Sequence, residues 1–338
     1  MAGRADRIAD SSRLILITGG SGYVGSALVP VIARRYRVRV FETMTFGNSI
    51  GGTPHVEFVQ ADIRDGAAVA TALRGVTDVI HLAGIVTDEL VDLNPGMALE
   101  VNVDATRRLC HLAVEAGVQR FIFASSSSVY GSQDLICTET TEPRPQTTYA
   151  GTKLAGEELL AQVSGKMTTI SVRCATLCGP APRMRLDTIV NTFCKQAFFD
   201  HVITVHGGGQ YRTNVHVQDV ADFYNFLLDA PARLVAGEVF NFTLRNDTAL
   251  NLGKMVLREA SSLRIPVTLR IDSSRRDDRS YRMDNSKARN ILRFMPKRAL
   301  EAAIVEDFHW FVNGKISDPN DALYYNTRRM APILRGEA

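Results

Sequence analysis

The chain has 338 residues, of which 45% are hydrophobic and 22% are charged, a composition typical of globular proteins and unlike that of disordered or fibrous ones. Its 39 lysines and arginines nearly balance 36 aspartates and glutamates, so neither composition nor any long basic block indicates nucleic-acid binding. No apolar stretch approaches the roughly 20 residues that a membrane span needs. We therefore expect a cytoplasmic protein with no nucleic-acid and no membrane partner.

The N-terminal residues 1–12 are polar and predict a flexible tail, not a targeting sequence. Five cysteines are an odd number in a chain without a secretory signal, so we expect no disulfide framework. Cys174 and Cys178 lie four residues apart, but no second cysteine or histidine pair with metal-ligand spacing accompanies them. They are interpreted as packing residues, and we expect no metal site.

Short β-rich apolar runs alternate with segments of helical period from residue 13 onward. The predicted strands cover 14–18, 38–42, 56–60, 78–82, 120–125 and 169–173, and predicted helices begin near residues 23, 65, 97 and 149. Six strands alternating with helices are typical of an α/β protein with a doubly wound parallel sheet, the Rossmann architecture. We assign this domain to residues 13–178.

The pattern is less regular after residue 178. A helix is predicted within 187–199, another over 217–228, and a strand over 238–242. We expect residues 212–243 to return to the Rossmann domain. Residues 179–211 and 244–338 are then predicted to form a smaller, interleaved C-terminal lobe that binds substrate.

A glycine-rich turn follows the first predicted strand and precedes a helix. Glycine permits a tight turn and lets backbone N–H groups approach a pyrophosphate at the positive end of the helix. Such turns also merely connect elements, but strand, turn and helix in this order favour dinucleotide binding. The predicted contacts in this turn are Gly19, Gly22, Tyr23, Val24 and Gly25.

Glu42 ends the second predicted strand, 17 residues beyond Gly25. A carboxylate there accepts hydrogen bonds from an adenosine ribose and repels a 2′-phosphate, which favours NAD over NADP; the alternative is an exposed glutamate at a strand end. Further cofactor contacts are expected where the next two strands end, because an open α/β sheet binds ligands at that edge. They are Asp62, Ile63, Leu82, Ala83 and Gly84.

A serine, a tyrosine and a lysine have the spacing of a catalytic set. Ser126 follows the fifth predicted strand, Tyr149 stands 23 residues further on, and Lys153 lies four residues after Tyr149, on the same helix face. A lysine ammonium near the phenol lowers a pKa that is normally about 10. The tyrosine can then take a proton from a hydroxyl that the serine holds. On an arbitrary helix a tyrosine and a lysine at this spacing are exposed surface residues without a catalytic role, but the preceding turn and strand favour the catalytic interpretation.

With these motifs the sequence resembles the extended short-chain dehydrogenase/reductases, especially the NAD-dependent epimerase/dehydratase family that acts on nucleotide sugars. The resemblance extends from Leu14 to about Trp310 and rests on T-G-G-S-G-Y-V-G, H-L-A-G, S-S-S-S-V-Y-G and Y-A-G-T-K, and on segments 101–106, 212–222 and 278–288. It implies Ser126, Tyr149 and Lys153 as the catalytic set, NAD as cofactor, a nucleotide-diphosphate sugar as substrate, and a homodimer formed through helices near 97–116 and 149–163.

The same resemblance implies further contacts. Asn102 and Cys174 are expected to contact the cofactor, as are Tyr149 and Lys153. Arg212 matches the position that contacts the nucleotide diphosphate, with help from Arg279 or Arg282. The aspartates interleaved with the arginines of 275–282 also fit a solvated mixed-charge loop. The predicted substrate contacts are Thr87, Ser127, Ser128, Thr176, Arg185, Asn191, Arg212 and Arg279.

Ser127 and Ser128 depart from part of the family's pattern. The sugar 4,6-dehydratases carry an Asp-Glu pair there, and a serine cannot readily protonate a leaving hydroxyl. The similar 3,5-epimerases have a cysteine where Ser128 stands. The serine run is similar to 4-epimerases of glucose-type or glucuronate-type nucleotide sugars. Thr176 and the basic segment 182–187 also depart from the usual pattern, and an arginine there can meet a substrate phosphate or carboxylate.

The sequence therefore favours a nucleotide-sugar epimerase that oxidises a hydroxyl, at C4, with bound NAD and reduces it again on the other face. A net dehydrogenase or 4-ketoreductase, or a dehydratase, remains open on the same residues. A non-catalytic NAD(P)-binding sensor is a different class, and intact Ser126, Tyr149 and Lys153 argue against it.

Overall fold

The computed structural model describes residues 10–274 and 280–337. A seven-stranded sheet forms the larger part of the molecule, in the order β11-β7-β5-β4-β1-β2-β3, and every neighbouring pair is parallel. The expected doubly wound α/β fold is thereby confirmed. The strands are β1 (Asp10–Thr18), β2 (Tyr36–Glu42), β3 (Val56–Gln60), β4 (Asp78–His81), β5 (Arg120–Ser126), β7 (Thr168–Cys174) and β11 (Glu238–Phe242).

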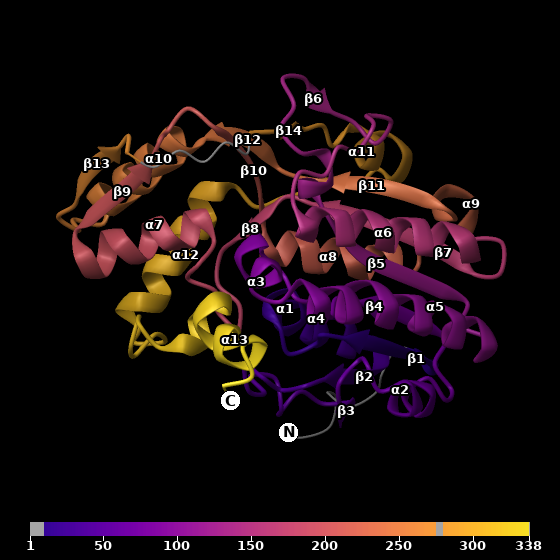
Figure 1. Ribbon diagram of the computed structural model, residues 1–338. Helices are drawn as coiled ribbons and strands as arrows, with labels where there is room; N and C mark the ends of the chain where they lie inside the picture. Colours follow the sequence, from indigo (N-terminus) through magenta and orange to yellow (C-terminus); the bar gives the residue numbers. More distant parts are fainter. Residues whose placement is uncertain (1–9, 275–279, 338) are drawn as a thin grey trace, which may run out of the picture.

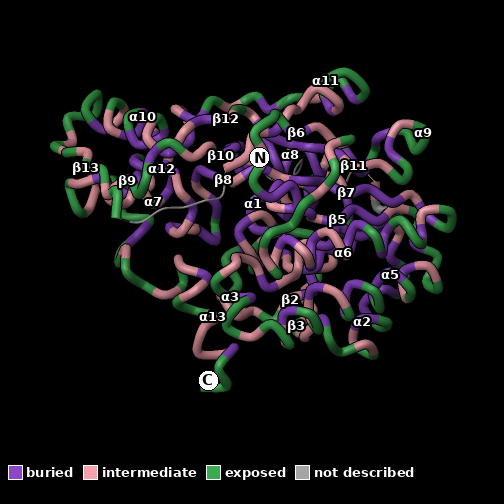
Figure 2. Tube along the Cα trace, turned by 45° about the horizontal axis from the view of Figure 1, so that its top comes forward, coloured by how far each residue is buried: buried purple, intermediate pink, exposed green. Residues whose placement is uncertain are grey.

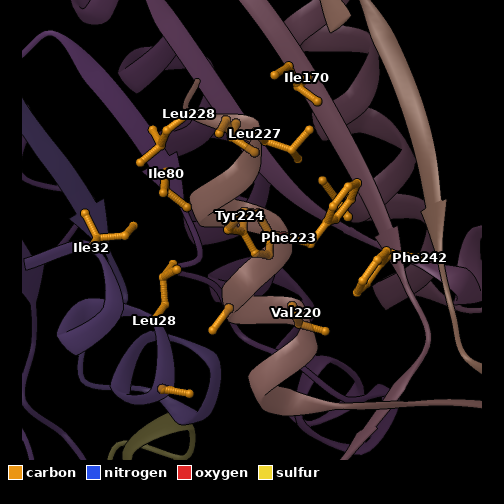
Figure 3. Close-up of a cluster of buried hydrophobic side chains, with 14 of the residues drawn as sticks. Leu28, Ile32, Ile80, Ile170, Val220, Phe223, Tyr224, Leu227, Leu228 and Phe242 are labelled. Carbon is orange, nitrogen blue, oxygen red and sulfur yellow. The ribbon is translucent and has the colours of Figure 1, made fainter. Parts of the chain in front are cut away.

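Helices cover both faces of this sheet, because alternate residues of each strand are apolar on opposite sides. Ile15 and Ile17 of β1 face a core built with α1 and α8, whereas Leu14 and Leu16 face a second core with α2, α5 and α6. Figure 3 shows the first core, where Phe223 and Leu227 of α8 lie among side chains of α1 and the sheet. The helices are α1 (Tyr23–Ala33), α2 (Gly66–Ala72), α5 (Ala105–Glu115), α6 (Thr148–Val163), α8 (Val217–Leu227) and α9 (Ala232–Val235).

The smaller lobe lies beyond the carboxyl ends of the main strands, on the left in Figure 1, and has a hydrophobic core of its own. In the burial view its interior is also purple beneath an exposed rim (Figure 2). Its elements are α7 (Ile189–Lys195), the π-helix η3 (Gln196–Asp200), β9 (Val202–His206), α10 (Ala249–Ser262), β13 (Thr268–Asp272) and α12 (Leu300–Val312), with β9 and β13 paired in parallel.

Two small sheets and several short helices complete the fold. One sheet pairs β10 (Tyr211–His216) with β8 (Thr176–Cys178) and β12 (Arg245–Thr248), and the other pairs β6 (Ile136–Cys137) with β14 (Arg282–Met283). The remaining elements are α3 (Asp88–Leu93), α4 (Pro95–Leu99), the π-helix η1 (Glu100–Asp104), the 3₁₀ helix η2 (Ser127–Tyr130), α11 (Ser286–Leu292), the 3₁₀ helix η4 (Ala322–Tyr324) and α13 (Asn326–Leu334).

Two expectations about segment boundaries differ from the structure. Residues 10–12, assigned to the tail, belong to β1, because the backbone of Asp10 pairs with the start of β2 and its N–H bonds the carbonyl of Arg35. Residues 1–9 lie outside the described part. Within 212–243, α8 and β11 pack on the main sheet, whereas β10 belongs to the three-stranded sheet between the lobes.

Candidate functional site

A cavity of about 910 Å³ lies at the carboxyl ends of the main strands and extends to the smaller lobe. Glu42, Ser126 and Cys174, at the ends of β2, β5 and β7, line it together with Arg212 and Gln196 from beyond the sheet. The strand order reverses between β1 and β4, and open α/β sheets bind ligands at such a reversal. The cavity therefore occupies the position expected of a cofactor and substrate site.

The glycine-rich turn forms one wall of this cavity. Gly19 has a φ of +73°, and a Cβ there would lie 2.7 Å from the backbone nitrogen of Ala83. A Cβ on Gly25 would lie 2.5 Å from the carbonyl oxygen of Gly19, so both positions require glycine. Helix α1 has no side-chain cap and no acidic residue in its first turn. Its first N–H groups therefore suit an anion, which fits a dinucleotide pyrophosphate.

Glu42 and Asp62 differ in how their carboxylates are used. Glu42 lines the cavity, and its Oε1 accepts hydrogen bonds from the backbone N–H (2.9 Å) and hydroxyl (3.1 Å) of Thr43. Asp62 also lines it but is paired with Arg64, at 2.8 Å between Nη2 and Oδ2, and this bond holds the pKa of Asp62 below its usual value. The predicted neighbours Ile63, Leu82, Ala83 and Gly84, and Tyr23 and Val24 of the turn, all line the cavity.

Ser126, Tyr149 and Lys153 all line the cavity. Ser126 ends β5, and its Oγ accepts hydrogen bonds from the N–H (3.2 Å) and hydroxyl (2.9 Å) of Ser128. Tyr149 and Lys153 lie one turn apart on α6, which begins with the side chain of Thr147 as its cap. The Nζ of Lys153 donates to the carbonyl of Ala124, at 2.9 Å.

The pKa of Tyr149 differs from the sequence-based expectation. Burial raises this pKa to about 12. A hydrogen bond with Ser126 and the charge of Arg185 oppose the shift, whereas the charge of Asp88 adds to it. Burial also lowers the pKa of Lys153 to about 8. The lowered pKa that was expected for Tyr149 is not found, because its phenol is buried and the ammonium of Lys153 donates its hydrogen bond to the carbonyl of Ala124. The positive charge of Arg185 nevertheless lies close enough to act on the tyrosine.

Asn102 and Asn191, which were predicted as ligand contacts, are not among the residues that line the cavity. Asn102 holds the backbone of Ile85 through both its amide oxygen (2.8 Å) and its nitrogen (2.9 Å). Asn191 accepts from the N–H of Gly179 at 3.0 Å and donates to the carbonyl of Arg185 at 2.8 Å. Both amides are buried and used by the backbone, so these residues position the wall behind the site.

The other predicted substrate contacts divide into two groups. Thr87, Ser127, Ser128, Thr176, Arg185 and Arg212 line the cavity. Arg185 is paired through Nε with Asp187 at 2.8 Å, and Arg212 is almost wholly buried. Thr87 has a φ of +91°, and its buried hydroxyl has no hydrogen-bond partner. Arg279 lies outside the described residues. Cys174 also lines the cavity, and burial raises its pKa to about 12.

Several lining residues were not predicted. Tyr281 accepts a hydrogen bond from the hydroxyl of Ser127, at 3.4 Å, and belongs to the 278–288 segment that the sequence had singled out for its arginines. Arg183 belongs to the basic segment 182–187, which also offered a signal. Asn326, Met330 and Ile333 come from the C-terminal helix α13, where no motif marked them.

Within 10–274 and 280–337 no helix has the length and apolar character needed to cross a membrane. Over the same residues no three histidine, cysteine, aspartate or glutamate side chains are placed to hold a metal ion. The five cysteines are free.

The parallel sheet, the glycine-rich turn and the serine, tyrosine and lysine at its carboxyl edge together define a Rossmann-fold protein of the short-chain dehydrogenase/reductase class. The chain belongs to the NAD dependent epimerase/dehydratase family, whose family model matches residues 15–242. Family membership confirms the resemblance drawn from the sequence and the NAD dependence expected with it.

The chain is similar to proteins of several activities. It is 35% identical over 175 residues to a 3-beta-hydroxysteroid dehydrogenase of Mycolicibacterium neoaurum, covering 47% of this chain and 46% of that one. It is 27% identical over 314 residues to the uncharacterized UDP-glucose epimerase YtcB of Bacillus subtilis, covering 87% of this chain and 96% of that one. MoeE5, solved with UDP-glucuronic acid and NAD, superposes with a TM-score of 0.76 at 26% identity, covering 89% and 99%. The chain spans about half the length of the first curated relatives it matches.

Proposed function

We propose that this protein is an NAD-dependent nucleotide-sugar epimerase that inverts a sugar carbon, at C4, by oxidation and re-reduction. The observation that carries the proposal is the joint placement of Ser126, Tyr149 and Lys153 in one cavity that also reaches the smaller lobe. A cavity of about 910 Å³ has room for a dinucleotide and part of a second ligand. The similarity to YtcB and MoeE5 over most of their length supports the same reaction class.

Each catalytic side chain has a distinct part in this proposal. The phenolate of Tyr149 takes the proton of the sugar hydroxyl, and the hydroxyl of Ser126 donates a hydrogen bond to the same oxygen. Lys153, anchored on Ala124, keeps a positive charge beneath the reacting end. NAD, when bound, supplies the hydride acceptor and a positive charge that lowers the pKa of Tyr149. After the sugar turns, Tyr149 returns the proton to the oxygen on the other face.

Epimerisation is favoured over dehydration by the residues after Ser126. Ser127 and Ser128 both line the cavity, where a dehydratase needs groups that can protonate a leaving hydroxyl. The hydroxyl of Ser128 donates a hydrogen bond to the hydroxyl of Ser126, and that of Ser127 donates to the hydroxyl of Tyr281. Both hydroxyls are therefore suited to holding sugar oxygens, and neither can supply acid and base at neutral pH.

The charge of Arg185 at the reacting end supports a glucose-type or glucuronate-type sugar. Arg185 lines the cavity and acts electrostatically on Tyr149. Its Nε donates a hydrogen bond to Asp187, and the N–H groups at the end of the guanidinium can donate to a sugar oxygen or carboxylate. Within this proposal a uronate gains most from Arg185, because a carboxylate forms charge-assisted bonds with a guanidinium.

The test is incubation of the purified protein with UDP-glucose and UDP-glucuronic acid, followed by NMR of the sugar and by NADH absorbance. We expect the 4-epimer to form with no net NADH. Steady NADH accumulation would identify a net dehydrogenase, and a 4-keto-6-deoxy product would identify a dehydratase; either result contradicts the epimerase proposal. Tyr149→Phe is the control, since it removes the proton acceptor and leaves the cavity wall in place.

We also propose that the protein forms a homodimer in the cytoplasm. Helices α5 and α6 pack side by side on one face of the sheet, and Leu99, next to them, is 47% exposed. Burial of such a face against a second copy is the common way to cover an apolar surface. Sedimentation of the wild type and of Leu99→Glu tests it: a monomeric wild type would refute the dimer, and dissociation of the variant would support it.

A further inference from the structure

The last part of the chain crosses from the smaller lobe to the sheet side of the cavity. We define the C-terminal strap as residues 318–335, which contain η4 and α13. Tyr324 and Tyr325 pack on the core of the smaller lobe, whereas Leu334 is buried in a separate cluster with Leu90 of α3. Figure 1 shows α13, in yellow, beside α3. The strap therefore joins the two sides of the cavity.

The strap is part of the cavity wall and is fastened on several sides. Asn326, Met330 and Ile333 line the cavity. Hydrogen bonds attach the strap to the segment after β2, to α3 and to the loop before α7. They run from Arg329 Nε to the carbonyl of Thr45 (2.8 Å), from Thr327 Oγ1 to Glu89 (3.1 Å), from Asn94 to the carbonyl of Leu334 (2.9 Å), and from the N–H of Leu186 to the carbonyl of Tyr324 (2.9 Å).

Arg183 is the side chain that the strap holds in the cavity. It is only 5% exposed, and its Nη2 donates to Asn326 Oδ1 at 2.6 Å. Its guanidinium lies over the ring of Phe46, at 3.9 Å, and its buried Nε has no hydrogen-bond partner. Burial lowers the pKa of Arg183 to about 9. An enclosed guanidinium with an unbonded N–H needs an acceptor, and an anionic ligand is the favourable one.

The position of Arg183 identifies which ligand this is. Its backbone N–H donates to the hydroxyl of Ser26, in the first turns of α1, at 3.0 Å. The carboxylate of Glu42 is among the groups that stabilise its charge. Arg183 thus lines the same cavity as the uncapped start of α1, which suits a pyrophosphate, and Glu42, which suits the adenosine ribose.

We propose that Arg183, held by Asn326, binds the adenosine diphosphate half of NAD, and that the C-terminal strap closes over the bound cofactor and retains it between turnovers. Asn326 also fixes the reacting end, because its N–H donates to Asp187 at 2.7 Å and Asp187 holds Arg185. This inference rests on the proposed reaction, in which one NAD is oxidant and reductant in the same turnover. An enzyme of that kind gains from a cofactor that does not leave.

The test measures NAD dissociation without any sugar. Protein loaded with NAD is mixed with excess ADP, and release is followed for the wild type, Arg183→Met and Asn326→Ala. Hydrogen bonds to charged groups are each worth about 1.5–3 kcal/mol, so release should be at least about tenfold faster in both variants. The control is Arg328→Ala, in the same helix. Arg328 does not line the cavity, and its guanidinium lies 4.0 Å from the centre of the Tyr325 ring. Wild-type release from both folded variants would overturn the proposal.

A second measurement needs no substitution. Limited proteolysis of the wild type across residues 313–321 is compared with and without NAD, and bound NAD should slow cleavage several-fold because the strap then stays closed. Equal cleavage rates would overturn the closure. A protein that retains NAD through Arg183 and yet epimerises no sugar nucleotide would contradict the proposed reaction alone, so failure of the two proposals can be told apart.

Discussion

Arg173 of β7 and Glu157 of α6 form a two-point ion pair, with Nε to Oε1 at 2.9 Å and Nη2 to Oε2 at 2.7 Å. Their side chains are only 5% and 7% exposed. Glu157 lies on α6 one turn after Lys153, and it also accepts a hydrogen bond from Ser125, which precedes Ser126. The pair therefore links the helix that carries Tyr149 and Lys153 to the strands beneath it.

Removing one partner of this pair should cost much of the protein's stability. Arg173→Met leaves Glu157 as an uncompensated buried charge, so the free energy of unfolding should fall by about 3–5 kcal/mol. Urea unfolding followed by circular dichroism measures it. The exposed pair of Arg37 and Glu57, with side chains 49% and 45% exposed, is the control. Arg37→Met should change the free energy by less than about 1 kcal/mol, and equal effects at the two sites would contradict the structural role of Arg173.

The second prediction concerns the cofactor turn. Gly25→Ala places a Cβ about 2.5 Å from two backbone carbonyl oxygens, those of Gly19 and Gly20, so the turn must move and NAD affinity should fall by at least about tenfold. Equilibrium dialysis with NAD measures this loss. The control is Gly151→Ala on α6, where a Cβ meets nothing within 4 Å. There alanine should leave affinity unchanged and stabilise the helix by about 0.5–1 kcal/mol; tight NAD binding by the Gly25 variant would count against this site.

The sheet and the placement of Ser126, Tyr149 and Lys153 in one cavity could be predicted from the sequence because local patterns determine them. Residues 14–17 of β1 are all apolar and buried, as expected of a strand that is buried on both faces. Gly19 and Gly25 were predicted because a strand, a tight turn and a helix follow one another directly. Tyr149 and Lys153 were predicted because one helical turn separates them. In each case the interaction lies within a few residues of the chain.

The remaining part of the site depends on contacts between distant residues. Asn94 and Leu334 meet across 240 positions, and nothing in the sequence of α13 marks Met330 as part of a cavity wall. The sequence also could not show that the amide of Asn102 is hydrogen-bonded to the backbone of Ile85. Spacing placed Lys153 beside Tyr149, yet it could not show that the ammonium turns to Ala124.

The pH dependence of the reaction should follow the charges around Tyr149. Asp88 raises and Arg185 lowers the pKa of this phenol, and Tyr149 acts as a base only when it is deprotonated. Asp88→Asn should therefore lower that pKa and move the rising limb of kcat/KM to lower pH, whereas Arg185→Met should move it to higher pH. The profiles are measured with one sugar nucleotide across the alkaline range.

The opposite signs of these two shifts provide an internal control. A purely structural effect of either substitution lowers kcat/KM at all pH values and leaves the shape of the profile unchanged. Shifts in the same direction, or none, would show that Tyr149 is not the titrating base. Arg328→Ala, distant from the cavity, should leave both the rate and the profile unchanged.

Asp307 of α12 should make stability depend on pH. It is fully buried, and this burial raises its pKa well above the usual value, although the side chain of Cys194 opposes the shift. Because the folded state holds this proton more tightly than the unfolded chain, the resulting stability is fully present below the unfolded pKa of about 3.8. It is lost as pH rises toward the folded pKa.

Asp307→Asn should remove this loss, since an amide keeps the shape of the carboxyl and does not ionise. The variant should therefore unfold at a higher urea concentration than the wild type at pH 8, and its advantage should shrink toward pH 4. The control is Asp92→Asn, at an exposed position of α3, which should follow the wild type throughout. If Asp307→Asn were less stable than the wild type at pH 8, the buried carboxyl would be ionised and paired in the folded protein.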